Sequence, residues 1–368
     1  MKILFLTDQF HLHGGVEKVL SQKLNYLVKF DNYEVHLVTT ENKNNLFCYE
    51  TSEKVNHSDL SINYNRSKSF FHVTNLIKVP LHLHLLKRKI KKINPDVIIV
   101  CNYSFDFYFL PFISNGAKII KEYHSSRYTY IKNLPKFNLI DKFLFKLNNF
   151  FEKKYNYLVL LNKDEKKYYC SNNIKIIPNP AFDYGISNYD NRANIIIAAG
   201  RIAPVKQFDH LIKIWSLISN RHNNWELHIY GEGDKNLQFK LQKLIDTLKV
   251  PNIFLKGATS ELHLKMKKAS VFALTSQTEC FPMVLLESLS CGLPVISYDC
   301  PNGPRNIISN NKDGILISHN DIESFAEVLE NTINNFELRK EMSVNAKLNI
   351  KRFDEITVMQ NWIELFKK

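Results

Sequence analysis

The sequence predicts an α/β protein of two doubly wound, Rossmann-like domains that face a central cleft. Three observations support this fold class. Short, continuous apolar runs alternate with helical patterns along the chain, which is typical of parallel sheets buried on both faces. The runs fall into two sets. A length of 368 residues also exceeds what one hydrophobic core usually serves.

Ten apolar runs are expected to be strands. Those in the first half of the chain are Ile3–Leu6, Val35–Val38, Val97–Cys101, Ile119–Lys121 and Leu158–Leu161. Those in the second half are Ile195–Ala199, Leu227–Tyr230, Ile253–Leu255, Val271–Leu274 and Val295–Ser297. Helical patterns predict helices over Val16–Val28, Leu81–Ile93, Leu139–Tyr155 and Met283–Cys291.

The segment Ala181–Ala193 is polar and lacks periodicity, and it follows Ile177-Pro178-Asn179-Pro180. It therefore marks the expected domain boundary. We expect a first domain over residues 1–185, a second over residues 186–350, and a C-terminal helix over residues 351–368 that can cross back to the first domain.

Composition argues against several classes of protein. Asp8 breaks the opening apolar run, so no secretory signal is predicted, and no stretch approaches the roughly 20 apolar residues of a membrane span. Six cysteines are scattered, with no Cys-x-x-Cys pair and no His cluster at ligand spacing. This pattern predicts reduced thiols in the cytoplasm and no metal site.

The net charge of +13 is unevenly distributed. Residues 1–190 carry 27 Lys and Arg against 17 Asp and Glu, whereas residues 191–368 carry 22 against 19. The basic half has no zinc-finger spacing, RNA-binding strand signature or isolated recognition helix, so we expect no nucleic-acid partner. An anionic membrane surface or a phosphorylated acceptor fits the excess better.

The most informative stretch sets two carboxylates, Glu279 and Glu287, eight positions apart. Glu279 lies in the turn Gln277–Pro282 after an expected strand, and Glu287 lies one to two turns inside the following helix. The two acids can therefore face one ligand from two sides. The helix start carries unpaired N–H groups and the positive end of the helix dipole, which suits a diphosphate. A nucleotide sugar has that anion between two hydroxyl-rich rings.

Further candidate residues also follow expected strands, where open parallel sheets bind their ligands. They are Gly14-Gly15, Gly200-Arg201 with Lys206, and Gly231-Glu232-Gly233. Arg201 and Lys206 offer a guanidinium and an ammonium, which stabilise the charge that grows on a departing diphosphate. No Asp-x-Asp pair occurs in the chain, so we expect these cations to act without a metal ion or another cofactor.

In these motifs the chain resembles a retaining glycosyltransferase of the two-Rossmann-domain class (GT-B), in the bacterial family numbered four (glycosyl transferases group 1). The motifs that carry the resemblance are Gly14-Gly15-Val16-Glu17, Glu122-Tyr123-His124, Ile177-Pro178-Asn179-Pro180, Gly200-Arg201 with Lys206, Gly231-Glu232-Gly233, and the E-x7-E element from Glu279 to Glu287. Pro301-Asn302-Gly303-Pro304-Arg305 also looks like a loop of enzymes that build bacterial surface polysaccharides.

The resemblance implies roles for the site residues. Glu287 would accept hydrogen bonds from the nucleotide ribose, and Glu279 would contact hydroxyls of the donor sugar beside the catalytic pair Arg201 and Lys206. His124 would touch the donor sugar. The residues that would hold the donor mainly through their backbone are Gly14, Gly15, Gly200, Gly231, Phe281, Met283 and Val284, whereas Pro282 has no N–H to give.

Each residue also has a purely structural interpretation. Glu279 can be an ordinary loop acid, Glu287 an internally paired one, His124 a structural histidine and Gly14-Gly15 a simple turn. The basic segment Leu81–Ile93 carries Lys87, Arg88, Lys89, Lys91 and Lys92. A solvated helix face and a peripheral membrane patch are both consistent with it. The run Leu139–Tyr155, with phenylalanines among lysines, adds to the second.

We therefore expect a retaining, metal-independent enzyme that moves a hexose or N-acetylhexosamine from a UDP-sugar to a glycan linked to polyprenyl diphosphate. Its product would be a bacterial O-antigen, lipopolysaccharide or capsule glycan. The second domain would hold the donor and the first the acceptor, in the cytoplasm or at the inner face of the cytoplasmic membrane. Two alternatives stay open. One is a sugar-nucleotide epimerase or hydrolase, which would need acid/base carboxylates in the first domain. The other is an inactive scaffold of a polysaccharide assembly complex.

Overall fold

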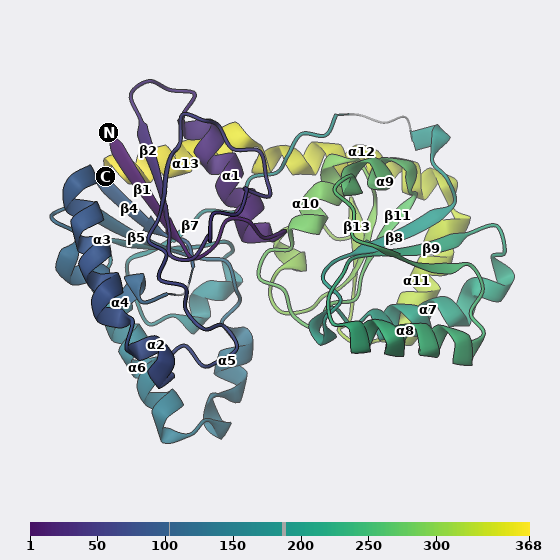
Figure 1. Ribbon diagram of the computed structural model, residues 1–368. Coiled ribbons are helices and arrows are strands. Elements are labelled where there is room, and N and C mark those ends of the chain that lie inside the picture. The colour runs from purple at the N-terminus through teal and green to yellow at the C-terminus, as the bar shows by residue number, and fades with distance from the viewer. Residues whose placement is uncertain (103, 186–188) are drawn as a thin grey trace. The chain divides into compact units, whose positions relative to one another are not determined.

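The computed structural model describes residues 1–102, 104–185 and 189–368, which divide into two compact units (Figure 1). The N-terminal unit comprises Met1–Pro180 and Val358–Lys368, and the C-terminal unit comprises Ala181–Thr357. Residues 186–188, inside the expected boundary segment, lie outside the described residues. The chain leaves the N-terminal unit at Pro180 and returns to it through its last helix.

A parallel sheet of seven strands, in the order β3-β2-β1-β4-β5-β6-β7, forms the N-terminal unit. Its strands are β1 (Lys2–Thr7), β2 (Glu34–Thr39), β3 (Asn56–Asp59), β4 (Val97–Val100), β5 (Lys118–Tyr123), β6 (Tyr157–Leu160) and β7 (Ile174–Ile176). Its helices are α1 (Gly15–Leu27), α2 (Val73–Leu76), α3 (Val79–Ile93), α4 (Asp106–Ile113), α5 (Tyr128–Asn133), α6 (Leu139–Glu152) and α13 (Glu355–Lys367). Helix α13 begins in the C-terminal unit and belongs to the N-terminal unit from Val358 onward.

Successive residues of β1 enter different cores, as the two-residue period of a strand requires. Ile3 and Phe5 pack with α1 and α13 on one face of the sheet, whereas Leu4 and Leu6 pack with α3 and α4 on the other. Both faces are therefore covered by helices, which explains why this strand reads as a continuous apolar run.

The C-terminal unit has a parallel sheet of six strands in the order β10-β9-β8-β11-β12-β13. Its strands are β8 (Ile195–Ala199), β9 (Glu226–Tyr230), β10 (Ile253–Gly257), β11 (Val271–Leu274), β12 (Val295–Tyr298) and β13 (Gly314–Ile317). Its helices are α7 (Phe208–Ile218), α8 (Lys235–Leu248), α9 (Leu262–Lys268), α10 (Met283–Ser290), α11 (Ile322–Asn334) and α12 (Phe336–Asn349).

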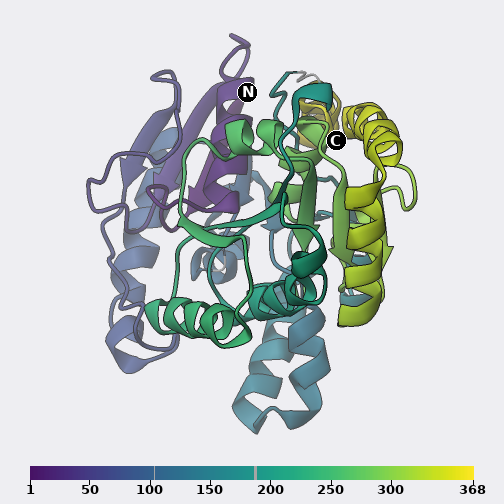
Figure 2. The same cartoon turned by 90° about the vertical axis from the view of Figure 1, so that its right-hand side faces the viewer.

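These helices form two layers. The first has α7 packed against α8 and α11, and the second has α10 packed against α9 and α12. Figure 2 shows α7 and α8, in teal and green, below the strands of this unit. The sheet is thus buried between helices on both faces. The fold class predicted from the sequence is confirmed, and all ten apolar runs are strands.

Three strands were not expected from the sequence, and all three lie at sheet edges: β3, β7 and β13. An edge strand has a neighbour on one side only and tolerates polar residues. The β3 sequence Asn-His-Ser-Asp contains no apolar residue, and β7 exposes Lys175 and Ile176. Apolar runs therefore cannot identify β3 or β7, whereas β13, Gly-Ile-Leu-Ile, is apolar but was not singled out from the sequence. No helix in the described part of the chain is long and apolar enough to span a membrane.

Candidate active site

Loops of the C-terminal unit meet where its strand order changes direction. β8 and β11 are hydrogen-bonded neighbours although they are far apart in the sequence. The β8 loop (Gly200–Gln207) therefore meets the β11 loop (Thr275–Pro282), and the Gln277 N–H donates to the Val205 carbonyl at 2.7 Å. Such a change of direction creates the crevice in which open parallel sheets bind ligands.

The loop after β12 holds the backbone of Glu279 from both sides. The Glu279 N–H donates to the Pro301 carbonyl at 2.8 Å, and the Glu279 carbonyl accepts from the N–H groups of Asn302 and Gly303 at 2.8 and 2.9 Å. The Thr278 hydroxyl donates to the same Pro301 carbonyl at 2.8 Å. Tertiary hydrogen bonds therefore fix the direction of the Glu279 side chain.

Lys206 and Glu279 form an ion pair at the meeting point of these loops. Lys206 Nζ lies 2.6 Å from Glu279 Oε1, and the Ser276 hydroxyl donates to the same oxygen at 2.7 Å. The two charged side chains are only 19% and 12% exposed. Glu279 Oε2 makes no hydrogen bond to a described residue and is the oxygen left for a ligand hydroxyl. Ser276 was not singled out from the sequence, because a serine in a loop carries no distinctive signal.

Arg201 lies in the same β8 loop but is exposed. It precedes Ile202, which forms a bridge to Gly233 after β9. Within the described part of the chain, the Arg201 guanidinium makes no hydrogen bond or ion pair. The two predicted cations therefore differ, because Lys206 is held by a carboxylate while Arg201 is free to bind an anion.

Gly200 and Gly231 each have a structural explanation. A Cβ on Gly231 would lie 1.9 Å from the Gly200 carbonyl oxygen, and its φ of +148° is unfavourable for other residues. A Cβ on Gly200 would lie 3.3 Å from Lys206 Cε. The two glycines thus permit the close approach of adjacent loops and of the Lys206 side chain.

The start of α10 adjoins the Glu279 loop. Pro282 is its N-cap, Met283 its first residue and Val284 its second, and both helical residues are partly exposed. Phe281 is 6% exposed, and its ring lies 5.5 Å from that of Phe353. The Phe281 side chain therefore belongs to the core, which leaves its backbone for a ligand.

Glu287 lies on α10 and is 5% exposed. Its neighbours on the helix, Leu285, Leu286 and Leu289, are fully buried. Burial of a carboxylate among such side chains is costly unless partners satisfy it. The structure thus places both acids of the E-x7-E element in one unit, one on the β11 loop and one on the helix that this loop begins.

The predicted glycines of the N-terminal unit lie at the start of α1, where Gly14 is the N-cap and Gly15 the first helical residue. The Glu17 carboxylate folds back onto this turn, since a Cβ on Gly14 would lie 2.0 Å from Glu17 Oε2. Burial raises the pKa of Glu17. A hydroxyl that approaches the turn would find a hydrogen-bond acceptor, whereas a phosphate would meet a carboxylate.

His124 follows β5 and lies beside a buried carboxylate. Its Nε2 is 3.3 Å from Glu122 Oε2, while Glu122 Oε1 pairs with Lys23 of α1. Lys23 and Glu122 are fully buried, and Lys23 Nζ also lies 4.2 Å from the Trp362 ring centroid. Burial opposes ionisation of Glu122, but Lys23 and then His124 outweigh it and lower the Glu122 pKa. The acid therefore holds Nε2 of His124, while Nδ1 makes no hydrogen bond to a described residue.

Lys23 was not singled out from the sequence, although a signal exists. It lies on the apolar stripe that Leu20, Leu24 and Leu27 form along α1. A charge on the buried stripe of a helix requires an opposite charge inside the protein. The sequence could thus have indicated a buried partner for Lys23, but only the fold identifies it as Glu122.

Asp8 is a second buried acid that was not expected to act. It follows β1, and its Oδ2 lies 2.9 Å from Arg66 Nη2. Arg66 also pairs with Glu41, whose Oε2 has no hydrogen-bond partner among the described residues. Burial raises the pKa of Asp8 to about 6, against the opposing effect of Arg66. A carboxylate that titrates near neutral pH thus lies where the strand order of the N-terminal unit changes direction.

The structure thus distributes the predicted residues over two units. The C-terminal unit holds Gly200, Arg201, Lys206, Gly231, Glu279, Phe281, Met283, Val284 and Glu287, whereas the N-terminal unit holds Gly14, Gly15 and His124. Among the described residues, no three His, Cys, Asp or Glu side chains lie where they could hold a metal ion.

Comparisons with known proteins identify related sequences. Residues 184–349 match the family profile described as glycosyl transferases group 1. The chain is 25% identical to an uncharacterized glycosyltransferase of Haemophilus influenzae, over 98% of each chain. It is 24% identical to a poly(ribitol-phosphate) alpha-N-acetylglucosaminyltransferase of Staphylococcus aureus, over 92% of this chain and 70% of that protein.

The fold also matches a solved structure over the whole chain. The crystal structure of a TarM mutant from S. aureus, in complex with fondaparinux, alpha-GlcNAc-glycerol and UDP, superposes with a TM-score of 0.79 at 17% identity. All of both chains is covered. At this identity the match concerns the fold.

Proposed function

We propose that this chain, a glycosyltransferase of group 1 with the GT-B fold, is a retaining, metal-independent family 4 enzyme of bacterial surface-polysaccharide synthesis. It moves a hexose or N-acetylhexosamine from a UDP-sugar to a glycan acceptor linked to polyprenyl diphosphate. The observation that carries the proposal is the Lys206–Glu279 ion pair, which forms where the β8 loop, which also carries Arg201, meets the β11 loop.

The C-terminal unit binds the donor in this proposal. The start of α10 and the Arg201 guanidinium attract the diphosphate, because both present positive charge to an anion. Glu279 Oε2 and Glu287 accept hydrogen bonds from the hydroxyls of the sugar and the ribose. The UDP bound by the similarly folded TarM mutant supports a uridine nucleotide, and the related N-acetylglucosaminyltransferase supports an N-acetylhexosamine.

Catalysis depends on charge that develops as the diphosphate leaves. Negative charge grows on the β-phosphate in the transition state, so Arg201 and Lys206 stabilise that state more than the bound donor. The Lys206 ammonium is already held by Glu279, whose Oε1 also accepts a hydrogen bond from Ser276, so little reorganisation is needed. The departing phosphate takes the acceptor proton on the same face of the sugar, which retains the anomeric configuration.

The N-terminal unit binds the acceptor. The Glu17 carboxylate, in the first turn of α1, offers a hydrogen-bond acceptor to the hydroxyl groups of the acceptor, and His124, which follows β5, touches the donor sugar. Glu122 sets the orientation of the His124 ring through Nε2. His124 therefore serves to position the sugar, and the mechanism does not require it as a base.

A panel of nucleotide sugars tests the proposal directly. Thermal denaturation is measured with UDP-, GDP- and ADP-sugars, each at about 100 times its dissociation constant, where a ligand adds roughly 2.7 kcal/mol of stability. We expect a large shift of the midpoint with one or more UDP-sugars. Transfer to a lipid-linked acceptor, followed by analysis of the anomeric product, tests the reaction. An inverted product contradicts retention.

Glu287→Gln should raise the KM for the donor more than it lowers kcat. A ribose contact is present equally before and during the reaction, and an amide oxygen is a weaker acceptor than a carboxylate. Steady-state kinetics and donor calorimetry measure the effect, with the exposed acid variant Glu341→Gln as a control. Unchanged donor affinity in a folded Glu287→Gln protein would assign this acid a purely structural role.

The epimerase or hydrolase alternative finds support in Asp8. Such an enzyme needs an acid or base in the N-terminal unit, and the pKa of Asp8, about 6, suits that task. Product analysis with and without acceptor separates the classes, because a transferase consumes donor much faster when the acceptor is present. An inactive scaffold would not consume donor under either condition.

The proposed membrane association rests on α6, which exposes an apolar stripe. Leu139, Ile140, Phe143 and Phe150 are 85%, 70%, 62% and 53% exposed. Their spacing places them on one face of the helix, with Lys142, Lys146, Lys153 and Lys154 on or next to α6. An apolar face flanked by cations is typical of a helix that lies in the surface of an anionic membrane. Figure 1 shows α6 and α5 at one end of the N-terminal unit.

Replacing Phe143 and Phe150 with asparagine should release the protein from anionic vesicles. Each buried phenylalanine contributes about 1.5–3 kcal/mol to insertion, so two substitutions should abolish most binding. Sedimentation with phosphatidylglycerol vesicles measures the bound fraction. The control replaces Phe239 of α8, which is 71% exposed in the C-terminal unit. Equal binding of the double variant and the parent would exclude α6 as the membrane contact.

A further inference from the structure

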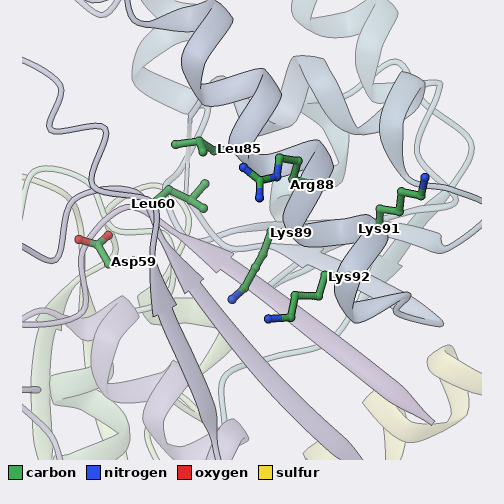
Figure 3. Close-up of a pocket in the computed structure, with 7 residues that line it drawn as sticks. All are labelled: Asp59, Leu60, Leu85, Arg88, Lys89, Lys91 and Lys92. Atoms are coloured by element: carbon green, nitrogen blue, oxygen red, sulfur yellow. The ribbon is translucent and has the colours of Figure 1, made fainter.

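A basic groove lies between helix α3 and the edge strand β3, outside the site described above. Its first recess has a volume of about 590 Å³ and is lined by Asp59, Leu60, Leu85, Arg88, Lys89, Lys91 and Lys92. An adjoining recess of about 510 Å³ shares Lys89 and Lys92 and continues along β3 to Asn56. We call these two recesses the α3–β3 groove (Figure 3).

The helical repeat places one stripe of α3 on this groove. Leu85 lies three and four residues before Arg88 and Lys89, and Lys92 lies four and three residues after them, so all four share a face of the helix. Leu86, Ile90 and Ile93 lie on a neighbouring face of the helix and are buried in the core, with Ile93 also lining the second recess. The exposed large apolar side chain of α3 is Leu81 (54%), so this helix has no exposed apolar stripe like that of α6. The membrane interpretation of this basic segment loses its main support.

The cations that α3 contributes to the groove lack partners of opposite charge, whereas Lys2 of the second recess pairs with Glu34 at 3.5 Å. No ion pair joins Arg88, Lys89, Lys91 or Lys92 to an acid among the residues that the structure describes. In Figure 3 the amino groups of Lys89 and Lys92 extend to the same side of the recess, whereas Lys91 extends away from them. Burial and then the neighbouring Lys92 lower the pKa of Lys89. Like charges held this close are costly unless an anion joins them.

Asp59, the one acid of the first recess, does not neutralise these cations. Its carboxylate accepts hydrogen bonds from the Thr39 and Ser61 hydroxyls at 2.9 and 3.1 Å. It also accepts from the N–H groups of Asn42 and Lys43 at 3.2 and 3.3 Å. These donors hold Asp59 at the rim, so the face of α3 remains available to a ligand.

We propose that the α3–β3 groove binds phosphate groups of the acceptor, which Arg88, Lys89 and Lys92 hold as a phosphodiester or diphosphate. A guanidinium and two ammonium groups are the donors that recognise phosphate oxygens. The inference rests on the proposed function in one respect, because it takes the ligand to be the glycosyl acceptor.

The position of the groove determines which kinetic constant it affects. β3 is the edge strand, two strands from β1 and four from β5, which His124 follows. At about 4.8 Å per strand, the groove lies on the order of 10 Å or more from the loops expected to hold the reacting sugar. It therefore binds a remote part of the acceptor. Such binding lowers the KM for acceptor and leaves reaction of the donor with water unaffected.

Binding is tested first with inorganic pyrophosphate by calorimetry in 0.1 M salt. The groove variant replaces Arg88, Lys89 and Lys92 with glutamine, and the control replaces Lys54, Lys68 and Lys87, which are exposed in the same unit and do not line the groove. Both variants lose three positive charges. A change in affinity caused by the lower net charge, or by pyrophosphate that binds at Arg201, would therefore be the same in both. We expect the groove variant to bind pyrophosphate at least about tenfold more weakly than the parent. The control should bind it about as tightly as the parent. Equal affinities overturn the proposal.

Transfer assays then identify the source of the phosphate. With a phosphate-bearing acceptor, the groove variant should show at least a tenfold higher KM than the control at similar kcat. With a short neutral acceptor, both should match the parent. If the groove variant instead loses binding to phosphatidylglycerol vesicles while its acceptor KM is unchanged, the groove is a lipid-headgroup site and the proposal fails. If the parent transfers no sugar, the proposed function is refuted. The pyrophosphate experiment would still show whether the groove binds phosphate.

Discussion

Replacing Lys206 with alanine should lower kcat by about 10²–10³-fold while donor affinity changes much less. Lys206 supplies charge where the diphosphate departs, so its contribution is largest in the transition state. Its removal also leaves Glu279, which is 12% exposed, without its cation. Arg201→Ala should show the same separation of kcat from donor affinity. Single-turnover kinetics and donor calorimetry give the two quantities separately.

Two controls make this result specific. Lys213→Ala removes an exposed lysine of the same unit, one that pairs only with Asp209 on its own helix, and should leave kcat unchanged. A chelator should leave the parent rate unchanged. A rate that a chelator abolishes and manganese restores would contradict the metal-independent mechanism. If donor affinity falls as much as kcat, Lys206 acts mainly by binding the donor in the ground state.

Replacing Lys23 with methionine should destabilise the protein by about 3–5 kcal/mol, because a buried carboxylate then loses its main counterion. Lys23 and Glu122 are 1% exposed each, so bulk solvent does not screen the carboxylate. The paired variant Lys23→Met with Glu122→Gln should recover part of the loss. Urea unfolding measures the free energies. Arg221→Met, which breaks an exposed pair with Glu330, should change the free energy of unfolding much less.

The pH dependence separates this ion pair from simple packing. The pKa of Glu122 is lowered in the folded protein, so the pair stabilises the fold above the ordinary glutamate pKa of about 4.3 and is lost as the pH falls. The stability difference between parent and Lys23→Met should therefore be fully present at pH 7 and shrink as the pH falls below about 4.3. A difference that stays constant below this pH would assign the effect to packing against Trp362. Weaker sugar transfer by the paired variant would also indicate that Glu122 positions His124.

The sequence by itself determined the fold class and most of the strands. Continuous apolar runs such as Ile195–Ala199 and Val271–Leu274 appear wherever a strand is covered by helices on both faces. Burial on both faces requires apolar residues at successive positions of the strand, so a short stretch of sequence is enough to recognise it. The same logic failed for β3 and β7, because an edge strand has fewer neighbours and its residues face solvent.

The candidate site was only partly predictable for a related reason. Glu279 and Glu287 could be selected because a carboxylate beside or within an apolar helix stands out in the sequence. The Ser276 hydroxyl, the Lys23 partner of Glu122 and the pairing of Asp8 with Arg66 could not, because each joins residues from different elements. Distances between such residues depend on strand order, which apolar periodicity does not encode.

The basic segment of α3 shows most clearly what the tertiary structure decided. Its cations were evident from composition, but both a solvated helix and a membrane patch were consistent with them. Packing of Leu86 and Ile90 into the core fixes the rotation of the helix, and that rotation turns Arg88, Lys89 and Lys92 toward β3. Charge and periodicity belong to the sequence. The direction in which a helix presents them is set by the core against which its other face packs.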